Sequence, residues 1–387
     1  MSQLAVPSLL RLTGRRALPG PLALAAIALV GLLAGCAPAP VTLSKPAPAE
    51  GSTAPATVPT AAAAPSQPAG PTRTVRVALQ GVTSDAGVLV GLELGYYREQ
   101  GIEIEALYVR ALPDMLPMLI AGQVEAAGVG INAGTLNAAG RQAFKLVADK
   151  GSLTPGHGYL AWVVRQELAD SGRFRRDTDL RGLRFGITPP VEATQSMVAL
   201  QRLLDSLGLR PSDVELQAMP FGDMPAALTG GAIDTAFLSE PFVTAGEQHG
   251  ILMRWRGVDT IYPNLPLGLM AFSTRFLEEQ PDTARRFLVA YLRSVRRYLD
   301  AMDYGRDREA VVAALTRHTE VKDPALYERM VPAGLNPDGR IDLAALAGSV
   351  EVYRANGALA EMLDLNAIVD HRYVDYALER LGPYRGP

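Results

Sequence analysis

Polar residues at the ends of apolar stretches are the first candidates for chemistry in this sequence. Thr83, Ser84 and Asp85 lie between a predicted strand and a predicted helix, where they either cap the helix or reach a small molecule. The amide of Asn132 can both donate and accept hydrogen bonds. Groups of this kind favour binding over bond breaking. The candidate ligand-binding residues are Gln80, Thr83, Ser84, Asp85, Asn132, Thr194, Gln195, Ser196, Phe221 and Glu240.

The candidate residues from Thr194 onward are interpreted one by one, as ligand contacts or as structural residues. Residues 194–196 fall in the first turn of a predicted helix, where unpaired backbone N–H groups favour contact with a ligand. Glu240 follows a predicted strand and either contacts the ligand or bonds a helix or a hinge. Phe221, on a predicted loop, is either a stacking surface or part of the core.

Signals for catalysis are weak. The four histidines, at positions 157, 249, 318 and 371, show no metal-ligand spacing, and neither a GxSxG elbow nor a Walker A loop is present. Gly128, Gly130 and Gly134 miss the dinucleotide pattern GxGxxG by one residue. We therefore predict no catalytic residue, no metal site and no cofactor.

The only cysteine, Cys36, stands at the end of an apolar run. Three arginines precede this run, which covers residues 17–33 and is shorter than the roughly 20 residues of a membrane span. The sequence LAGC at 33–36 resembles the lipobox of bacterial lipoproteins, which implies that residues 1–35 are a signal peptide and that Cys36 carries lipid. The alternative is an ordinary signal peptide followed by a chance cysteine.

Residues 36–72 are dominated by Ala and Pro. Repeated proline disfavours helix, and too few bulky apolar side chains remain to offset the entropy of ordering. We predict a tether that joins the lipidated cysteine to a folded body outside the cytoplasm.

The charge balance argues against nucleic-acid binding. The chain has 37 basic and 40 acidic side chains, and its first 35 residues contain three Arg and no acid, so the remainder carries 34 − 40 = −6. An arginine-rich stretch at 285–297 has a buried apolar stripe and is interpreted as the solvated face of a helix.

The folded part contains a repeated half. The order strand, helix, strand, helix, strand occurs twice, about 108 residues apart, and predicts parallel sheets flanked by helices. The segment GQVEAA at 122–127 matches GAIDTA at 231–236 in its helix-ending glycine, its apolar strand entry and its acid. The predicted elements are 73–80, 87–100, 102–109, 115–121 and 124–129, and then 183–188, 192–207, 214–219, 224–229 and 233–238.

Two α/β lobes would face each other across a cleft, because ligands collect at the carboxyl ends of parallel strands. A strand at 268–272 returns to the first lobe and a helical extension follows it. We predict lobe 1 as 73–163 plus 266–387 and lobe 2 as 164–265, with hinges near 162–165 and 264–268.

Four motifs resemble the periplasmic substrate-binding proteins of ABC transporters, in the nitrate, sulfonate, taurine and thiamine-pyrimidine group. They are GYYREQGIEI at 95–104, GQVEAA at 122–127, DLRGLRFG at 179–186, and AALTGGAIDTA at 226–236 followed by EPF at 240–242. The resemblance implies a type II-like two-lobed fold with mostly parallel sheets. It also implies a monomer that captures a small-molecule solute and delivers it to an ABC permease with its cytoplasmic ATPase.

The resemblance is less specific about the solute. Pro189, Pro190 and Glu192 stand where relatives that bind sulfonate or nitrate often carry donor groups, which disfavours a small oxyanion. Seven aromatic residues, at positions 96, 97, 159, 162, 221, 242 and 255, make a heterocycle such as a pyrimidine or a flavin plausible, although core packing is the alternative for each. An extracytoplasmic enzyme ranks second and a structural surface lipoprotein third.

Overall fold

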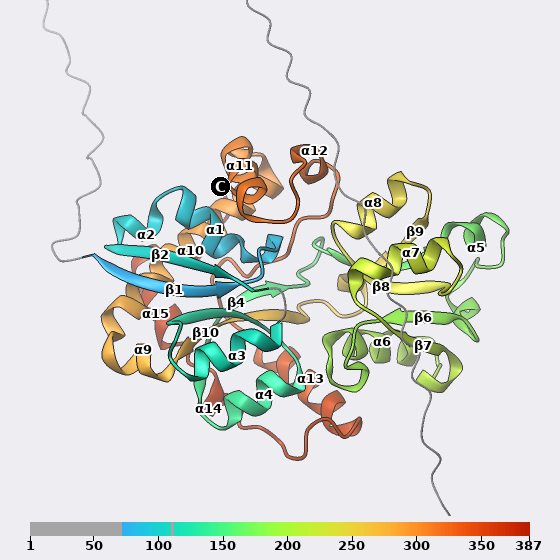
Figure 1. Cartoon of the computed structure of the whole chain (residues 1–387), viewed down its shortest axis with the longest axis horizontal. Coiled ribbons are helices and arrows are strands. Elements are labelled where there is room, and N and C mark those ends of the chain that lie inside the picture. Colours follow the sequence, from blue (N-terminus) through green and yellow to red (C-terminus); the bar gives the residue numbers. More distant parts are fainter. Residues whose placement is uncertain (1–71, 110–111) are drawn as a thin grey trace, which may run out of the picture. The chain divides into compact units, whose positions relative to one another are not determined.

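Ten strands form two separate sheets in the part of the chain that the computed structural model describes, residues 72–109 and 112–387 (Figure 1). The predicted signal peptide, Cys36 and nearly all of the predicted tether lie outside the described residues. The two sheets confirm the predicted α/β fold with two lobes.

The first sheet has the strand order β2-β1-β3-β10-β4. β1 pairs in parallel with β2 and β3, whereas β10 runs antiparallel between β3 and β4. Figure 1 shows α1 and α2 above this sheet and α3 and α4 below it. The elements are β1 (Arg73–Leu79), α1 (Ala86–Glu93), α2 (Tyr96–Glu99), β2 (Ile102–Tyr108), α3 (Leu112–Ile120), β3 (Ala126–Gly130), α4 (Ala133–Gly140), β4 (Phe144–Ser152) and β10 (Pro266–Ser273).

The second sheet repeats this plan with the order β7-β6-β8-β5-β9. Here β6 pairs in parallel with β7 and β8, and β5 is the reversed strand between β8 and β9. The elements are β5 (Leu160–Arg165), α5 (Gln166–Asp170), β6 (Arg184–Ile187), α6 (Gln195–Ser206), β7 (Glu215–Ala218), α7 (Met224–Thr229), β8 (Thr235–Ser239), α8 (Phe242–Gln248) and β9 (Leu252–Gly257).

Two corrections to the predicted limits follow from β5. The predicted boundary at 163/164 falls inside this strand, which pairs in the second sheet from Leu160 onward. The predicted hinge at 162–165 therefore lies within a sheet. The chain crosses between the sheets at 153–159 and 258–265, and these crossings pair with each other: Leu153 N donates to Leu265 O at 3.0 Å, and Asn264 N donates to Leu153 O at 2.8 Å.

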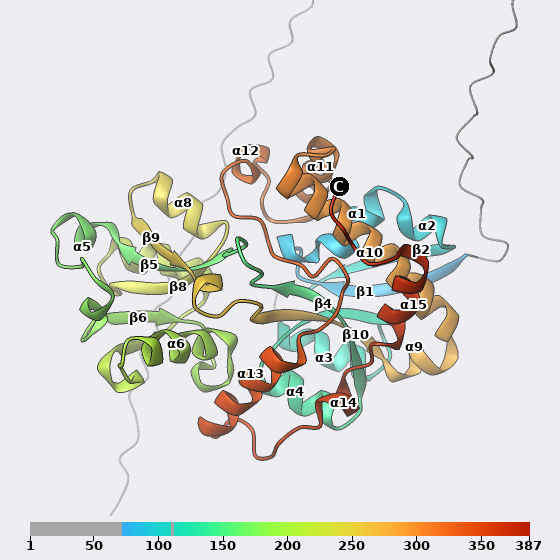
Figure 2. The ribbon, with the colours of Figure 1, turned by 180° about the vertical axis from the view of Figure 1, so that it is seen from behind.

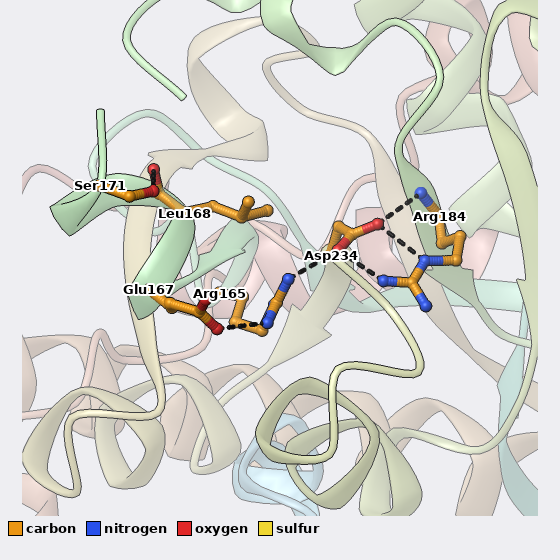
Figure 3. Close-up of polar contacts among 6 residues, drawn as sticks. All are labelled: Arg165, Glu167, Leu168, Ser171, Arg184 and Asp234. Carbon is orange, nitrogen blue, oxygen red and sulfur yellow. Dashed lines mark hydrogen bonds and ion pairs between the residues drawn. The ribbon is translucent and has the colours of Figure 1, made fainter. Parts of the chain in front are cut away.

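An ion pair recurs at matching places in the two sheets. In the first, the Arg76 side chain and backbone N–H both bind the Glu125 carboxylate. In the second, the Arg184 side chain and N–H bind Asp234 in the same way, and Arg165 adds a further bond at 3.0 Å (Figure 3). The acid in the repeated sequence motif is therefore a structural clamp that fixes the start of β3 or β8 to a neighbouring strand.

The helical extension packs mainly on the first lobe. Figure 2 shows α11 and α12 on one side of the first sheet and α13 and α14 on the other. On α10, four of the arginines that the sequence suggested as a solvated face are instead mostly covered, with side chains 14–32% exposed, and each forms an ion pair with a carboxylate. The helices are α9 (Thr274–Glu279), α10 (Pro281–Tyr304), α11 (Arg308–His318), α12 (Pro324–Tyr327), α13 (Leu343–Ala355), α14 (Leu365–Ile368) and α15 (Arg372–Leu381).

Candidate functional site

The loop after β1 is folded around the Asp85 carboxylate. Asp85 is 1% exposed, and its Oδ2 accepts hydrogen bonds from Gly81 N at 2.9 Å and Val82 N at 3.1 Å. Its Oδ1 lies 2.7 Å from Lys150 Nζ. The carboxylate thus closes the loop at the carboxyl end of β1 and binds a cation from β4 at the same time.

Lys150 is a buried lysine, 4% exposed, near the carboxyl end of β4. Its ammonium also donates to Ser84 Oγ at 3.3 Å. Glycines on two neighbouring strands make room for its aliphatic stem, because a Cβ at Gly128 would lie 2.6 Å from Lys150 Cε and one at Gly268 would lie 3.4 Å from Cδ. The buried ammonium of Lys150 requires a charged partner such as Asp85, because desolvation of an unpaired ion costs several kcal/mol.

Two further buried groups surround this pair. Burial raises the pKa of Asp149 to about 7, although Asn336 N donates to its Oδ2 at 2.8 Å. Tyr159 is 7% exposed, and burial raises its pKa as well. Ser84, Asp85, Asp149, Lys150 and Tyr159 are called the Lys150 cluster below.

Asn132 and Thr194 bring the two lobes into direct contact. The two residues form an isolated antiparallel bridge. The Asn132 side chain caps α4 by accepting from Thr135 N at 2.9 Å, and Thr194 stands at the N-cap position of α6. Thr194 Oγ1 is buried and has no hydrogen-bond partner among the described residues, whereas Ser196 Oγ shares a bond of 2.7 Å with Thr188.

Gln195 joins three parts of the molecule. Its side chain is buried, with Nε2 donating to Pro266 O of β10 and Oε1 accepting from Tyr353 Oη of α13 at 3.0 Å. Tyr353 Oη also lies 3.4 Å from Ile131 O. The amide therefore ties the helix of the second lobe to the first lobe and to the extension.

The remaining predicted residues form other contacts. The Glu240 carboxylate accepts from Thr244 N at 3.0 Å and Val331 N at 3.3 Å and pairs with Arg254, which is the helix-bonding alternative given above. Phe221 is half-buried and packs on Phe237, with ring centroids 6.3 Å apart. Gln80 and Thr83 are half-buried in the loop after β1.

Sequence reasoning missed Lys150, Asp149 and Tyr353. The adjacent Asp149 and Lys150, followed by glycine at the end of the apolar run 144–152, were a usable signal for a strand with a polar end. Tyr353 had no such signal, because it reaches Gln195 from a distant part of the sequence.

Three of the seven predicted stacking aromatics, Tyr97, Tyr159 and Trp162, are buried, and the other four are half-buried. Tyr97 and Trp162 are 1% and 0% exposed, and Trp162 packs on Phe185 and Phe237. Within residues 72–109 and 112–387 there is no cluster of three or more side chains that could hold a metal ion. No helix in these ranges has the length and apolar character needed to span a membrane.

Comparison with solved structures gives the same fold. A ligand-binding component of an ABC-type import system from Staphylococcus aureus, with zinc bound, has 16% identity and a TM-score of 0.62 over 79% of this chain and 99% of its own. The alkanesulfonate-binding protein SsuA from Xanthomonas axonopodis pv. citri, bound to MOPS, has 17% identity and a TM-score of 0.59 over 78% and 100%. The desulfurization enzyme DSZB has 16% identity and a TM-score of 0.54 over 79% and 99%.

Sequence comparison places most of the folded body in one family. No curated protein matches the chain. The sequence profile of the NMT1-like family matches residues 68–310, which is more than half of the chain. The chain therefore belongs to the NMT1-like family and has the two-lobed fold of the binding proteins of ABC importers.

Proposed function

We propose that this chain is the solute-binding component of an ABC importer. The observation that carries the proposal is the pair of separate sheets with matching strand order, joined by two crossings that are hydrogen-bonded to each other. Such a joint lets two rigid bodies hinge around a solute. The S. aureus and Xanthomonas proteins with this fold are binding proteins, which supports the same role here.

The proposed solute site lies at the strand ends that carry the Lys150 cluster and the lobe contact. Asn132, Thr194, Gln195 and Ser196 come from helix starts on both lobes. In the proposed cycle, opening of the lobes separates Gln195 from Pro266 and Tyr353, and its amide then exchanges these partners for the solute. Gln80, Thr83, Ser84, Asp85 and Phe221 complete the proposed set, and Glu240 is left out because its carboxylate already binds Thr244 N, Val331 N and Arg254.

A small organic solute is favoured, with a heterocycle of the pyrimidine or flavin type first and a sulfonate or nitrate second. Pro189 and Pro190 supply no N–H donor after β6, and Glu192 is exposed with a negative charge. Phe221 remains partly exposed for stacking. These features support a solute that is held by stacking and by single hydrogen bonds.

The proposed assembly is anchored outside the cytoplasm. Residues 1–35 are the proposed signal peptide, and residues 36–72 are a tether that starts at a lipid-bearing Cys36. With the limits that the strands give, lobe 1 is 73–159 plus 266–387 and lobe 2 is 160–265. The proposed partners are the solute and an ABC permease with its ATPase; the chain acts as a monomer and does not bind nucleic acid.

The anchor is tested by replacing Cys36 with Ser. The full-length wild type is expected to fractionate with membranes and to incorporate labelled fatty acid, whereas C36S loses the label. Equal labelling of both proteins would refute lipidation at this residue and leave solute binding untouched.

Solute binding is tested by native mass spectrometry of the purified protein and by thermal shift with heterocycles, sulfonates and nitrate. A solute at 100 times its Kd adds about 2.7 kcal/mol to the free energy of unfolding. A saturable shift with unchanged solute supports capture. The absence of both a copurified molecule and a shift with any class would contradict it.

An extracytoplasmic enzyme is the second candidate. It is favoured by one observation, the shared fold of the enzyme DSZB, which was also solved as a mutant with biphenyl-2-sulfinic acid. Incubation of the protein with an excess of each bound solute, followed by liquid chromatography and mass spectrometry, separates the candidates. Multiple turnovers to a product would replace capture with catalysis.

A further inference from the structure

Beside the loop after β1, three residues from distant parts of the sequence form a hydrogen-bonded chain. Tyr108, the last residue of β2, shares a bond of 2.8 Å with His318 Nδ1, and His318 Nε2 lies 2.6 Å from Glu93 Oε1. Glu93 belongs to α1 and His318 ends α11. A carboxylate, an imidazole and a hydroxyl follow one another in this chain. In such an arrangement the carboxylate fixes which ring nitrogen of the histidine carries the proton.

For a neutral His318 ring, this hydrogen-bonded chain of side chains has one consistent direction. Glu93 can only accept, so it requires a proton on Nε2, and Nδ1 of the neutral ring is then an acceptor for the Tyr108 hydroxyl. Arg317 also binds the second oxygen of Glu93, so this carboxylate has a cationic partner besides the histidine ring. Burial, followed by the charges of Asp85 and Glu93, raises the pKa of Tyr108, which keeps its proton on the oxygen.

Tyr108 is the exposed end of this hydrogen-bonded chain. Its side chain is 49% exposed, unlike the other partners in the chain. Its ring packs against the loop after β1, because a Cβ at Gly81 would lie 3.3 Å from Tyr108 Cδ1 and 3.0 Å from His318 O. The backbone of this loop is also held by Glu320 N, which donates to Gly81 O at 3.3 Å.

We propose that Glu93 and His318 hold the Tyr108 hydroxyl as a hydrogen-bond acceptor that selects solutes carrying an N–H or O–H donor. The proton of Tyr108 is committed to His318, so only the lone pairs of its oxygen face outward. A heterocycle with a ring N–H or an amino group satisfies them. Nitrate and ionised sulfonates offer only acceptor oxygens and would be repelled. This inference rests on the proposed function and narrows its solute class.

The direction of the chain is tested without any solute. In 15N-labelled protein, the two-bond proton–nitrogen correlations of His318, assigned with His318→Gln, should report a neutral ring with the proton on Nε2. Glu93→Gln should disturb this state. A ring protonated on Nδ1, or on both nitrogens, overturns the inference, because the Tyr108 hydroxyl would then point its proton outward.

The selection is tested with pairs of probes of which one carries a donor group and the other has it blocked by methylation, such as 1-methylcytosine and N4,N4,1-trimethylcytosine, together with nitrate and methanesulfonate. Tyr108→Phe should raise the Kd of 1-methylcytosine, which keeps its amino donor, about tenfold and leave the Kd of the trimethylated probe, which has no N–H donor, unchanged. The same change at Tyr304, which is 60% exposed, is the matched control and should alter neither.

The outcomes separate this inference from the proposed function. If the wild type binds nitrate or methanesulfonate and Tyr108→Phe binds them equally well, the inference fails while solute capture stands. An equal loss for both members of a probe pair also overturns it. A wild type that binds none of the probes counts against both proposals.

Discussion

At the scale of single residues, the strongest constraint is the charge buried beneath the first lobe's strand ends. Asp85 and Lys150 are both almost inaccessible to water and form one ion pair. Removal of one member leaves the other uncompensated, whereas removal of both exchanges the pair for neutral groups. The two kinds of variant therefore distinguish a pair that organises the loop from one that contributes little.

Lys150→Met should lower the free energy of unfolding by about 3–5 kcal/mol, because Asp85 is left as a buried anion. The double variant Asp85→Asn with Lys150→Met should lose less than the sum of the single losses. Urea denaturation measures both, with Lys322→Met at an exposed position as the control. Additive losses would show that the two charges do not interact.

Asp149 predicts a pH dependence of stability. Its pKa in the folded protein, about 7, lies above its value in the unfolded chain, so folding favours the protonated form. This contribution is fully present at pH values below the unfolded pKa and is lost as the pH rises through 7, with a slope of at most about 1.4 kcal/mol per pH unit. The variant Asp149→Asn lacks this pH-dependent contribution to stability.

The stability of Asp149→Asn relative to wild type should therefore increase from about pH 4 to pH 7 and stay constant above that range. Urea denaturation across this range measures the difference, in which other titrating groups cancel. A difference that does not change with pH would mean that Asp149 titrates alike in both states.

At the scale of elements, the sequence pattern predicted the strands and helices that recur in both halves and the parallel pairing of these strands, but not all of the breaks between them. The predicted helix at 87–100 is divided into α1 and α2, since Gly95 adopts a φ of 80°. The segments that form β4, β9, α4 and α8 were not among the predicted elements. The reversal of β5 and β10 depends on which lobe the chain has just left, which no local pattern records.

The repeated clamp makes the two lobes separately testable. Glu125→Gln should loosen the first sheet and Asp234→Asn the second, each by about 1–3 kcal/mol, because each leaves arginine donors without their charged acceptor. The loss at Asp234 should be larger, since it binds both Arg165 and Arg184.

Hydrogen exchange read by mass spectrometry localises these effects. Faster exchange should be confined to β1 and β3 in one variant and to β6 and β8 in the other. Glu279→Gln removes an exposed pair on α9 and serves as the control. Uniform acceleration over both sheets would refute independent lobes.

At the scale of the whole molecule, the lobe contact decided which site residues the sequence could foresee. Asn132, Thr194 and Gln195 were predicted because strand ends and helix starts converge in this class of fold, and Asn132 does meet Thr194, while Gln195 binds other partners in the first lobe and the extension. Their partners were not predicted: Pro266 and Tyr353 arrive from the return strand and the extension. Lys150 could have been suspected from the polar end of the apolar run 144–152, but its partner Asp85 could not, because the two meet only through the order of the strands.

Tyr353→Phe should loosen the closed arrangement. The loss of one hydrogen bond to Gln195, worth about 1 kcal/mol, should shift the ratio of open to closed molecules about fivefold toward the open form. Small-angle X-ray scattering without solute should report a larger radius of gyration at nearly unchanged melting temperature. Tyr304→Phe is the control, and an unchanged radius would exclude Tyr353 as a fastening between lobes.

The position of β10 also sets an order of events during synthesis. It lies between β3 and β4, yet it is made only after the whole second lobe. A growing chain can complete the second lobe first, while the first sheet lacks the strand that joins β3 to β4 until residue 273 has left the ribosome. The first sheet therefore stays open between β3 and β4 until the second lobe has been made.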